Sequence, residues 1–337
     1  MRLANLILAP LSALYGLALH IRHMLYDDHL LPSHTASVPT ICVGNLAVGG
    51  TGKTPHVEYL IGMLMSKYKI AVLSRGYGRK TRGFLLADSQ SSAQTIGDEP
   101  MQIHRHFPTV PVAVCENRIR GIRQLQRMVP GLQVVILDDA FQHRSLKCGM
   151  NILLTTADNL YVNDHLLPWG RLRDLKQRSL AAQTVIVTKC PANMKPIDKR
   201  VIDSTLHLPA YQQLYFSKMK YEPLPQATKP LVISGIANPQ YLFEHVKGTY
   251  PKATCIAFPD HHRFTKRDEA RIIELAQTHD TVFTTAKDYE RLKATNMLPI
   301  LDHKLAVIPV AVDLDVDTKP FEKQITNYIN ETLRHIQ

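Results

Sequence analysis

The sequence lacks the features that mark disulfide-stabilised and metal-scaffolded proteins. Its five cysteines, at positions 42, 115, 148, 190 and 255, are odd in number and show no C-x-x-C spacing. This pattern excludes a disulfide framework and a cysteine metal site, and it favours a reducing cytosolic setting. The chain also contains no internal repeat and no low-complexity tract. At 337 residues with 45% hydrophobic content, it indicates an ordinary globular protein of about two domains.

Acidic residues are in short supply. Asp and Glu number 29 against 40 Lys and Arg, which gives a formal net charge of +11. Such an excess indicates an acidic partner, namely a phosphorylated molecule, an anionic membrane or a nucleic acid. We expect no nucleic-acid partner, because the positive charges are dispersed and aromatic residues are not interleaved with them.

Long apolar runs are scarce as well. Residues 1–26 carry only two formal charges, but polar residues and a proline interrupt them, so the run is marginal for a membrane span. Its Leu and Ile residues share one helical stripe, and Tyr15, Arg22 and His23 are expected near lipid headgroups. We therefore expect an amphipathic helix over 1–28 that lies in the membrane interface. A spanning helix, a cleaved signal peptide and a packed core helix are the alternatives.

The most informative segment, residues 40–55, reads T-I-C-V-G-N-L-A-V-G-G-T-G-K-T-P. A short apolar strand passes into a glycine-rich turn whose backbone N–H groups can bind nucleotide phosphates. Lys53 is expected to reach the β- and γ-phosphates, and Thr54 to bind Mg²⁺ at the start of a helix predicted over 57–67. The predicted nucleotide-binding residues are Ala47, which stands where the usual pattern has its first glycine, Val48, Gly49, Gly50, Thr51, Gly52, Lys53 and Thr54.

Apolar runs alternate with helix-length segments along the rest of the chain. They lie at 69–74, 109–114, 133–137, 151–155 and 184–188, and again at 230–237, 254–258, 281–285 and 305–312. Strands that are apolar throughout and separated by helices indicate a parallel sheet covered on both faces. The predicted fold class is α/β, with a P-loop-containing parallel sheet, a second smaller α/β domain and the N-terminal membrane-interface helix. The predicted units are the helix 1–28, the P-loop kinase domain 29–215, the linker 216–229 and the smaller domain 230–337.

Two acidic pairs are candidates for phosphoryl-transfer chemistry. Asp138 and Asp139 follow the strand 133–137, where a P-loop enzyme needs a carboxylate for its Mg²⁺. The G-D-E-P turn at 97–100 adds Asp98 as a candidate general base and Glu99 as a metal-side helper. From spacing alone, a solvated acidic turn is an equal alternative.

The loop S-R-G-Y-G-R-K (74–80) is suited to an anionic or sugar-phosphate acceptor. Arg75, Arg79 and Lys80 accompany Tyr77 at the end of a strand. A solvated basic loop is the alternative. A GTPase is disfavoured, because T-K-C-P has Pro191 where the guanine-reading aspartate belongs, and Val48 stands where partitioning ATPases carry a lysine. An ATP-dependent kinase with Mg²⁺ is favoured by elimination.

Seven motifs together resemble those of the tetraacyldisaccharide 4'-kinases, which phosphorylate the lipid A precursor of Gram-negative bacteria. In the order of that family they are V-G-N-L-A-V-G-G-T-G-K-T-P, L-S-R-G-Y-G-R-K, G-D-E-P, D-D-A-F-Q-H-R, L-L-P-W-G-R-L-R, F-P-D-H-H-R-F and T-T-A-K-D. The resemblance implies transfer of the ATP γ-phosphate to the 4'-hydroxyl of a tetraacylated glucosamine disaccharide 1-phosphate. It also implies a peripheral or monotopic enzyme on the cytoplasmic face of the inner membrane.

The resemblance further implies roles for individual residues. Asp98 would be the base, working with His261 or, as the alternative, His262, while Lys53 acts on the phosphates. The residues around Mg²⁺ would be Thr54, Asp138, Asp139 and Glu99, and those on the lipid head-group side Arg75, Tyr77, Gln142 and His143. Two other functions compete with the lipid kinase: a P-loop kinase of a soluble phosphorylated metabolite, and a membrane-associated switch ATPase.

Overall fold

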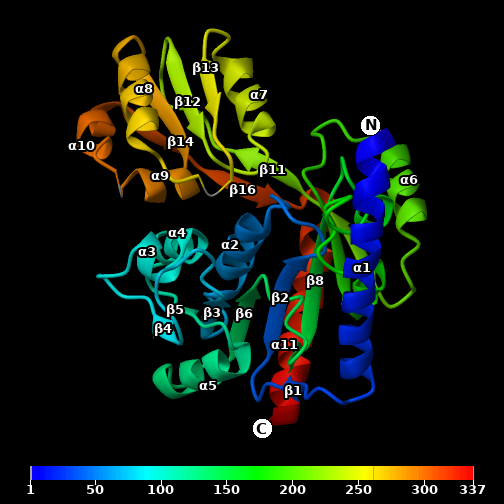
Figure 1. The fold of residues 1–337 in the computed structure, drawn as a ribbon. Helices are drawn as coiled ribbons and strands as arrows, with labels where there is room; N and C mark the ends of the chain where they lie inside the picture. Colours follow the sequence, from blue (N-terminus) through cyan, green and yellow to red (C-terminus); the bar gives the residue numbers. More distant parts are fainter. Residues whose placement is uncertain (1, 261, 294, 337) are drawn as a thin grey trace.

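Two parallel sheets, each covered by helices, make up most of the protein. The structure is a computed structural model that describes residues 2–260, 262–293 and 295–336. The smaller sheet lies over the P-loop end of the larger one, and the long helix α1 (Arg2–Asp27) runs along one side of the larger unit (Figure 1). This arrangement confirms the predicted α/β fold class with a parallel P-loop sheet.

The larger sheet has eight strands, and all of them except the edge strand β4 are parallel to their neighbours. Every residue of β2, β3, β6 and β9 is buried, which explains why these strands read as continuous apolar runs. In spatial order the strands are β10 (Gln213–Phe216), β9 (Thr184–Thr188), β8 (Met150–Thr156), β2 (Thr40–Asn45), β6 (Val134–Asp138), β3 (Ile70–Ser74), β5 (Val112–Val114) and β4 (Leu85–Leu86).

Helices cover both faces of this sheet. On one face pack α2 (Lys53–Leu64), α4 (Asp98–His106) and α11 (Thr318–Ile336). On the other face pack α5 (Arg118–Met128), α6 (Pro196–Leu206) and the stretches 140–148 and 157–182, which flank β8 in the chain. The short elements of this unit are β1 (His34–Thr35), β7 (Leu146–Lys147), α3 (Ala93–Ile96) and the 3₁₀ turns Tyr161–Asn163 and Lys176–Ala181.

The smaller sheet has four parallel strands, in the order β13 (Thr254–Ala257), β12 (Pro230–Ser234), β14 (Thr281–Thr285) and β15 (Leu305–Ile308). Its helices are α7 (Gln240–Thr249), α8 (Lys266–Gln277), α9 (Ala286–Leu292) and α10 (Leu298–Leu301), and the 3₁₀ turn Asp302–Lys304 follows α10. The single strand predicted over 305–312 is wrong, because Pro309 has no N–H to donate and divides it. Its second half, β16 (Val310–Asp313), pairs antiparallel with β11 (Lys218–Tyr221), which lies in the expected linker.

The last helix returns to the larger unit. Phe321, Ile325 and Ile329 of α11 are fully buried in the same core as the sheet residues Ile41 and Ile136. The 3₁₀ turn Asp315–Asp317 leads into it. The sequence-based division had placed all of 230–337 in the smaller domain, because an amphipathic helix does not reveal which sheet it covers. The smaller unit is therefore inserted between β10 and α11.

Helix α1 docks on the body of the protein rather than standing apart from it. Its outward face is apolar: Leu11, Leu14, Leu17, Ile21 and Met24 are exposed and recur every three or four residues. The expectation that Tyr15, Arg22 and His23 lie near headgroups is wrong, because all three bond to the protein body. No helix in the described part of the chain combines the length and the hydrophobicity that crossing a bilayer requires.

Candidate active site

The glycine-rich loop joins β2 to α2 at the carboxyl edge of the larger sheet. Gly49 and Gly52 have φ values of 104° and 87°, in the left-handed region that side chains disfavour. Because Gly52 turns the chain there, α2 begins at Lys53, four residues before the predicted start at position 57. The first N–H groups of α2 are left without intrahelical partners and are available to an anion.

Polar side chains from neighbouring strands hold the loop in shape. Asn45 Nδ2 donates to Thr51 Oγ1 at 2.9 Å, and Thr188 Oγ1 donates to the carbonyl of Thr51 at 2.9 Å. A Cβ on Gly50 would lie 3.2 Å from the Cβ of Ala237 in the smaller unit. The loop is therefore fixed from beneath by β2 and β9, and the smaller unit approaches it from above.

Lys53, the predicted phosphate-binding lysine, faces an acidic and polar cluster. Its Nζ lies 3.5 Å from Asn45 Oδ1 and 3.9 Å from Asp139 Oδ2. Arg173 joins the same cluster, since its guanidinium donates to Asn45 Oδ1 at 2.5 Å and to both carboxylate oxygens of Asp139. Burial alone would raise the pKa of Asp139, but the charges of Lys53 and Arg173 outweigh it and lower the pKa.

Asp138 lies deeper than its neighbour and has few partners. Ser74 Oγ donates to its Oδ2 at 3.1 Å. Burial raises the pKa of Asp138 to about 6, and the negative charges of Asp139 and Glu99 add to this rise. A buried carboxylate with neighbouring acids is a favourable position for a divalent cation, which would relieve both effects.

A buried arginine fixes the backbone of both aspartates. Arg118 begins α5 and is only 2% exposed. Its guanidinium donates to the carbonyl of Cys115 at 2.8 Å and lies 3.5 Å from the carbonyls of Asp138 and Asp139. Arg118 thus carries a positive charge beneath the acidic pair.

The G-D-E-P turn forms the first turn of α4 and meets the smaller unit. Arg291 Nε donates to Asp98 Oδ2 at 2.8 Å, and Lys287 Nζ lies 2.7 Å from Glu99 Oε1. Arg291 also bonds to Asp288 and to the carbonyl of Gly235, so its position is fixed within the smaller unit. Two basic residues of α9 therefore bind Asp98, the predicted base, and Glu99, the predicted metal-side acid.

Of the two predicted histidines, only His262 lies within the described residues. His261 lies outside the described residues. His262 Nε2 is 2.9 Å from Asp268 Oδ2, and its ring stacks on Phe258 at 4.9 Å between centroids. Because those contacts hold His262 within the smaller unit, the alternative assignment to His262 loses support, and His261 stays a prediction.

The basic loop after β3 divides into exposed and inward-facing residues. Arg75 and Tyr77 are exposed, and Tyr77 is 68% exposed, so both are accessible to an acceptor. Arg79 is turned inward, where it donates to Glu116 at 2.5 Å and to the carbonyl of Gly83 at 2.6 Å. The prediction that Arg79 grips the acceptor is therefore wrong, because its charge is used to fold the loop.

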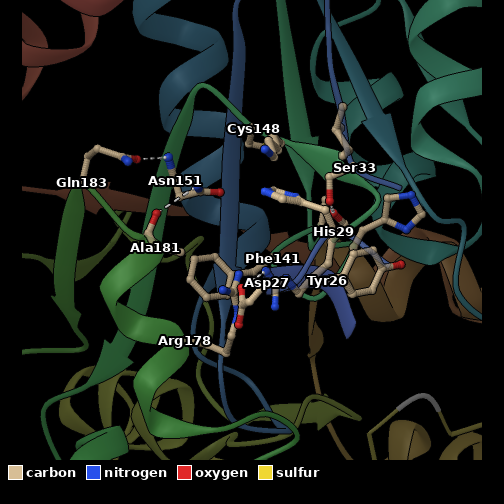
Figure 2. A pocket seen from close by; sticks show the side chains of 15 residues that line it. Tyr26, Asp27, His29, Ser33, Phe141, Cys148, Asn151, Arg178, Ala181 and Gln183 are labelled. Carbon is tan, nitrogen blue, oxygen red and sulfur yellow. Dashed lines mark hydrogen bonds and ion pairs between the residues drawn. The ribbon is translucent and has the colours of Figure 1, made fainter. Parts of the chain in front are cut away.

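Gln142 and His143 lie in the stretch that follows the aspartate pair. Gln142 Nε2 donates to the carbonyl of Asn45 at 2.8 Å, so its amide supports the end of β2. Burial lowers the pKa of His143 to about 4, and the charges of Arg118 and Arg75 contribute. His143 also lines a pocket of about 330 Å³ behind the end of α1 (Figure 2). Arg178, Phe141, Tyr26 and Asp27 gather on one side of that pocket.

The donor set suits Mg²⁺ bound partly through phosphate. No group of three or more His, Cys, Asp or Glu side chains suited to a metal occurs among the described residues. Mg²⁺ typically takes one or two carboxylates and completes its shell with phosphate oxygens and water. The hydroxyl of Thr54, in the first turn of α2, and the buried carboxylate of Asp138, at the end of β6, fit that requirement.

Sequence reasoning assigned no role to three polar residues of this site. Asn45, Arg173 and Arg291 contact Lys53, Asp139 and Asp98 respectively. Arg173 is the last residue of the L-L-P-W-G-R-L-R motif, so that motif could have indicated its role. Arg291 lies three residues beyond the T-T-A-K-D motif, so no motif indicated it. Neither arginine is near its partner in sequence, and only the fold brings them together.

A buried histidine beside the nucleotide loop, His56, makes the free energy of unfolding depend on pH. His56 Nδ1 is 2.7 Å from the carbonyl of Gly52 and Nε2 is 2.9 Å from Ser217 Oγ. Burial lowers its pKa from 6.5 to about 4. Because the unfolded chain takes up the proton first, the stability contributed by neutral His56 is present above pH 6.5 and is lost as the pH falls toward 4.

We expect His56→Gln, which does not titrate, to remove this pH dependence. Between about pH 7 and about pH 4.5, the unfolding free energy of the parent protein should fall by about 2 to 3 kcal/mol more than that of the variant. Urea unfolding at both pH values measures the difference. Equal losses in the two proteins would mean that the pKa of His56 is the same in the native and unfolded states.

Fold and site together define a P-loop phosphotransferase, with a Gly-Lys-Thr loop, two carboxylates at the end of β6 and a second unit over the site. Residues 4–330 match the sequence profile of a family described as tetraacyldisaccharide-1-P 4'-kinase. The chain belongs to that family.

Individual relatives agree with the family assignment. Tetraacyldisaccharide 4'-kinases of Parabacteroides distasonis and Bacteroides thetaiotaomicron are each 42% identical to this chain; the matches cover 98% and 97% of it and 96% and 94% of those proteins. Among solved structures, LpxK from Aquifex aeolicus in complex with ATP matches with a TM-score of 0.73 and 26% identity, covering 98% of this chain and all of that one.

Proposed function

We propose that this protein transfers the γ-phosphate of ATP to the 4'-hydroxyl of a tetraacylated glucosamine disaccharide 1-phosphate, a step of lipid A biosynthesis. Family membership supports the acceptor. The single observation that carries the chemistry is the meeting of Lys53, the buried Asp138 and the G-D-E-P acids at one edge of the sheet, beside a loop shaped for phosphates.

Positioning and charge neutralisation supply most of the rate in phosphoryl transfer. Lys53 is assigned to the β- and γ-phosphates, while the loop N–H groups between Gly49 and Gly52 would bind the remaining oxygens. Asp98 is assigned the role of base and would accept the proton of the 4'-hydroxyl. Its hydrogen bond from Arg291 orients the carboxylate.

Mg²⁺ would be held by Thr54 and Asp138, with Asp139 and Glu99 nearby to supply negative charge. When bound, the ion neutralises phosphate charge in the transition state. Arg75, Tyr77, Gln142 and His143 are assigned to the head-group side. Arg75 and Tyr77 are directly accessible, whereas Gln142 contributes mainly by supporting the end of β2.

The outward face of α1 supports a membrane-interface partner and a location on the cytoplasmic face of the inner membrane. It presents a continuous apolar stripe, and the protein as a whole carries a net charge of +11. An acylated acceptor resides in the bilayer, so an apolar stripe beside the site would bring the enzyme to its substrate. A basic protein is also attracted to anionic headgroups.

The double variant Leu14→Ser/Ile21→Ser tests the membrane interface. We expect its partition onto vesicles with anionic lipid to fall about tenfold or more, because two large apolar side chains no longer leave water. Ile300→Ser is the matched control, since Ile300 is 49% exposed in the smaller unit and Ile21 is 44% exposed. Vesicle sedimentation measures the partition. Equal losses in both variants would contradict the assignment of the α1 stripe.

The lipid-kinase assignment is tested with γ-labelled ATP, Mg²⁺ and the tetraacylated disaccharide 1-phosphate in detergent. Label in a bisphosphorylated lipid, located at the 4'-position by partial hydrolysis, is the expected result. Labelled soluble sugar phosphate formed without detergent would instead indicate a metabolite kinase. Hydrolysis of ATP with no labelled acceptor would indicate a switch ATPase.

A further inference from the structure

The inward face of α1 bonds to one segment of the larger unit, residues 166–174, which we call the bracing segment. Ser12 Oγ donates to the carbonyl of Leu166 at 2.9 Å and accepts from the backbone N–H of Trp169 at 3.0 Å. Tyr15 OH donates to the carbonyl of Arg173 at 2.9 Å. His23 Nε2 lies 2.6 Å from Asp174 Oδ1. Three turns of the helix thus contact one short segment.

The opposite side of the bracing segment bonds to the nucleotide loop. The N–H of Val48 donates to the carbonyl of Arg171 at 2.7 Å, and the N–H of Arg173 donates to the carbonyl of Leu46 at 2.8 Å. These two bonds flank an antiparallel bridge between Ala47 and Leu172. The first half of the P-loop is therefore paired with the bracing segment as a short ladder.

The bracing segment also carries the arginine that holds Asp139. Arg173 donates its side-chain hydrogens to Asp139 and Asn45, while its own carbonyl accepts from Tyr15. A shift of this segment would move the P-loop backbone and the Asp139 carboxylate together. The bracing segment lies between α1 and the P-loop and bonds to both.

We propose that α1 is a positioning element of the nucleotide site, acting through Tyr15 and the His23–Asp174 pair on Arg173 and the P-loop. The inference rests on the proposed function only in taking the loop as an ATP site, and it assigns the inward face of α1 a task separate from its apolar outward face. A helix that serves only to attach the protein to lipid needs no buried hydrogen-bonded pair beneath it.

The His23–Asp174 pair is the most buried of these contacts. His23 is 5% exposed and Asp174 is fully buried. Asp174 Oδ1 accepts from His23 and from the N–H of Leu175, while Oδ2 has no partner within the described part of the chain. Without His23, the carboxylate would keep a single hydrogen bond, and the segment would rearrange to find another.

The test is MgATP binding by calorimetry to the full chain in detergent, with no acceptor lipid. We expect His23→Ala to raise the Kd for MgATP about tenfold, the size associated with unpairing one buried polar group. His23→Gln, whose amide can donate to Asp174, should restore the Kd to within about threefold of the parent value. The matched control is His20→Ala, because His20 is exposed on the same helix.

Vesicle sedimentation separates this role from membrane attachment, since all three variants keep the outward stripe and should bind vesicles as the parent does. A parental Kd in folded His23→Ala overturns the proposal. If that variant does not fold, Tyr15→Phe decides, with an expected rise of about threefold for one lost hydrogen bond and an unchanged Kd as the contrary result. Because the readout is binding, it stands even if the parent labels no lipid.

Discussion

Lys53→Ala is expected to reduce lipid phosphorylation by about a thousandfold or more, the scale associated with removing a principal charge from a phosphoryl-transfer site. Lys53 is the cation of α2 that faces Asp139, at 3.9 Å, from the first position of the helix. No neighbouring lysine of α2 can replace it, since α2 carries no other lysine. The γ-labelled lipid assay measures the loss, with MgATP held above its KM.

Lys67→Ala is the control for charge removal, because Lys67 lies beyond the end of α2 and is exposed. Its turnover should match that of the parent protein. Thermal unfolding of both variants shows whether the loss reflects the site or the fold. If Lys53→Ala keeps more than about a tenth of parental turnover, Lys53 does not stabilise the transition state appreciably.

Asp98→Asn is expected to lower kcat by about a hundredfold to a thousandfold with little change in the KM for ATP. The substitution keeps the shape of the side chain and an oxygen that can accept from Arg291. It removes the basic oxygen needed for the proton of the acceptor hydroxyl. Initial rates over a range of ATP concentrations separate the two constants.

Asp203→Asn removes an exposed carboxylate of α6 and should leave both constants unchanged. A parental kcat in Asp98→Asn would remove Asp98 from the role of base. A large rise in the KM for ATP would instead place Asp98 with the nucleotide. Either result would mean that the contact between Asp98 and Arg291 serves mainly to join the two units.

Much of the fold was predictable because buried parallel strands leave continuous apolar runs in the sequence. The strands predicted over 184–188 and 281–285 match β9 and β14 residue for residue. The start of α2 was placed too late, because Gly52 is a helix cap only by virtue of its positive φ. The packing of α11 on the larger sheet was not predicted. A 3.6-residue repeat shows that one face of a helix is buried, but it does not show which sheet that face packs against.

The site residues that were predicted lie within local sequence motifs. Those that were not predicted contact partners far away in the sequence. Lys53 and Thr54 are recognisable because spacing within one loop defines their geometry. Arg173 reaches Asp139 across 34 residues, and Arg291 reaches Asp98 across 193. Tyr15, Arg22 and His23 were assigned to the wrong side of α1, because amphipathic polar residues look alike whether they face headgroups or a buried carboxylate.

The insertion of the smaller unit before α11 has a consequence for the order of events during synthesis. Phe321, Ile325 and Ile329 complete the core that contains Ile41 and Ile136, yet they leave the ribosome after the whole smaller unit. Until α11 is made, one face of the P-loop sheet lacks part of its cover and exposes apolar surface. The smaller unit is synthesised before α11. The incomplete larger sheet is therefore prone to aggregation while the smaller sheet forms.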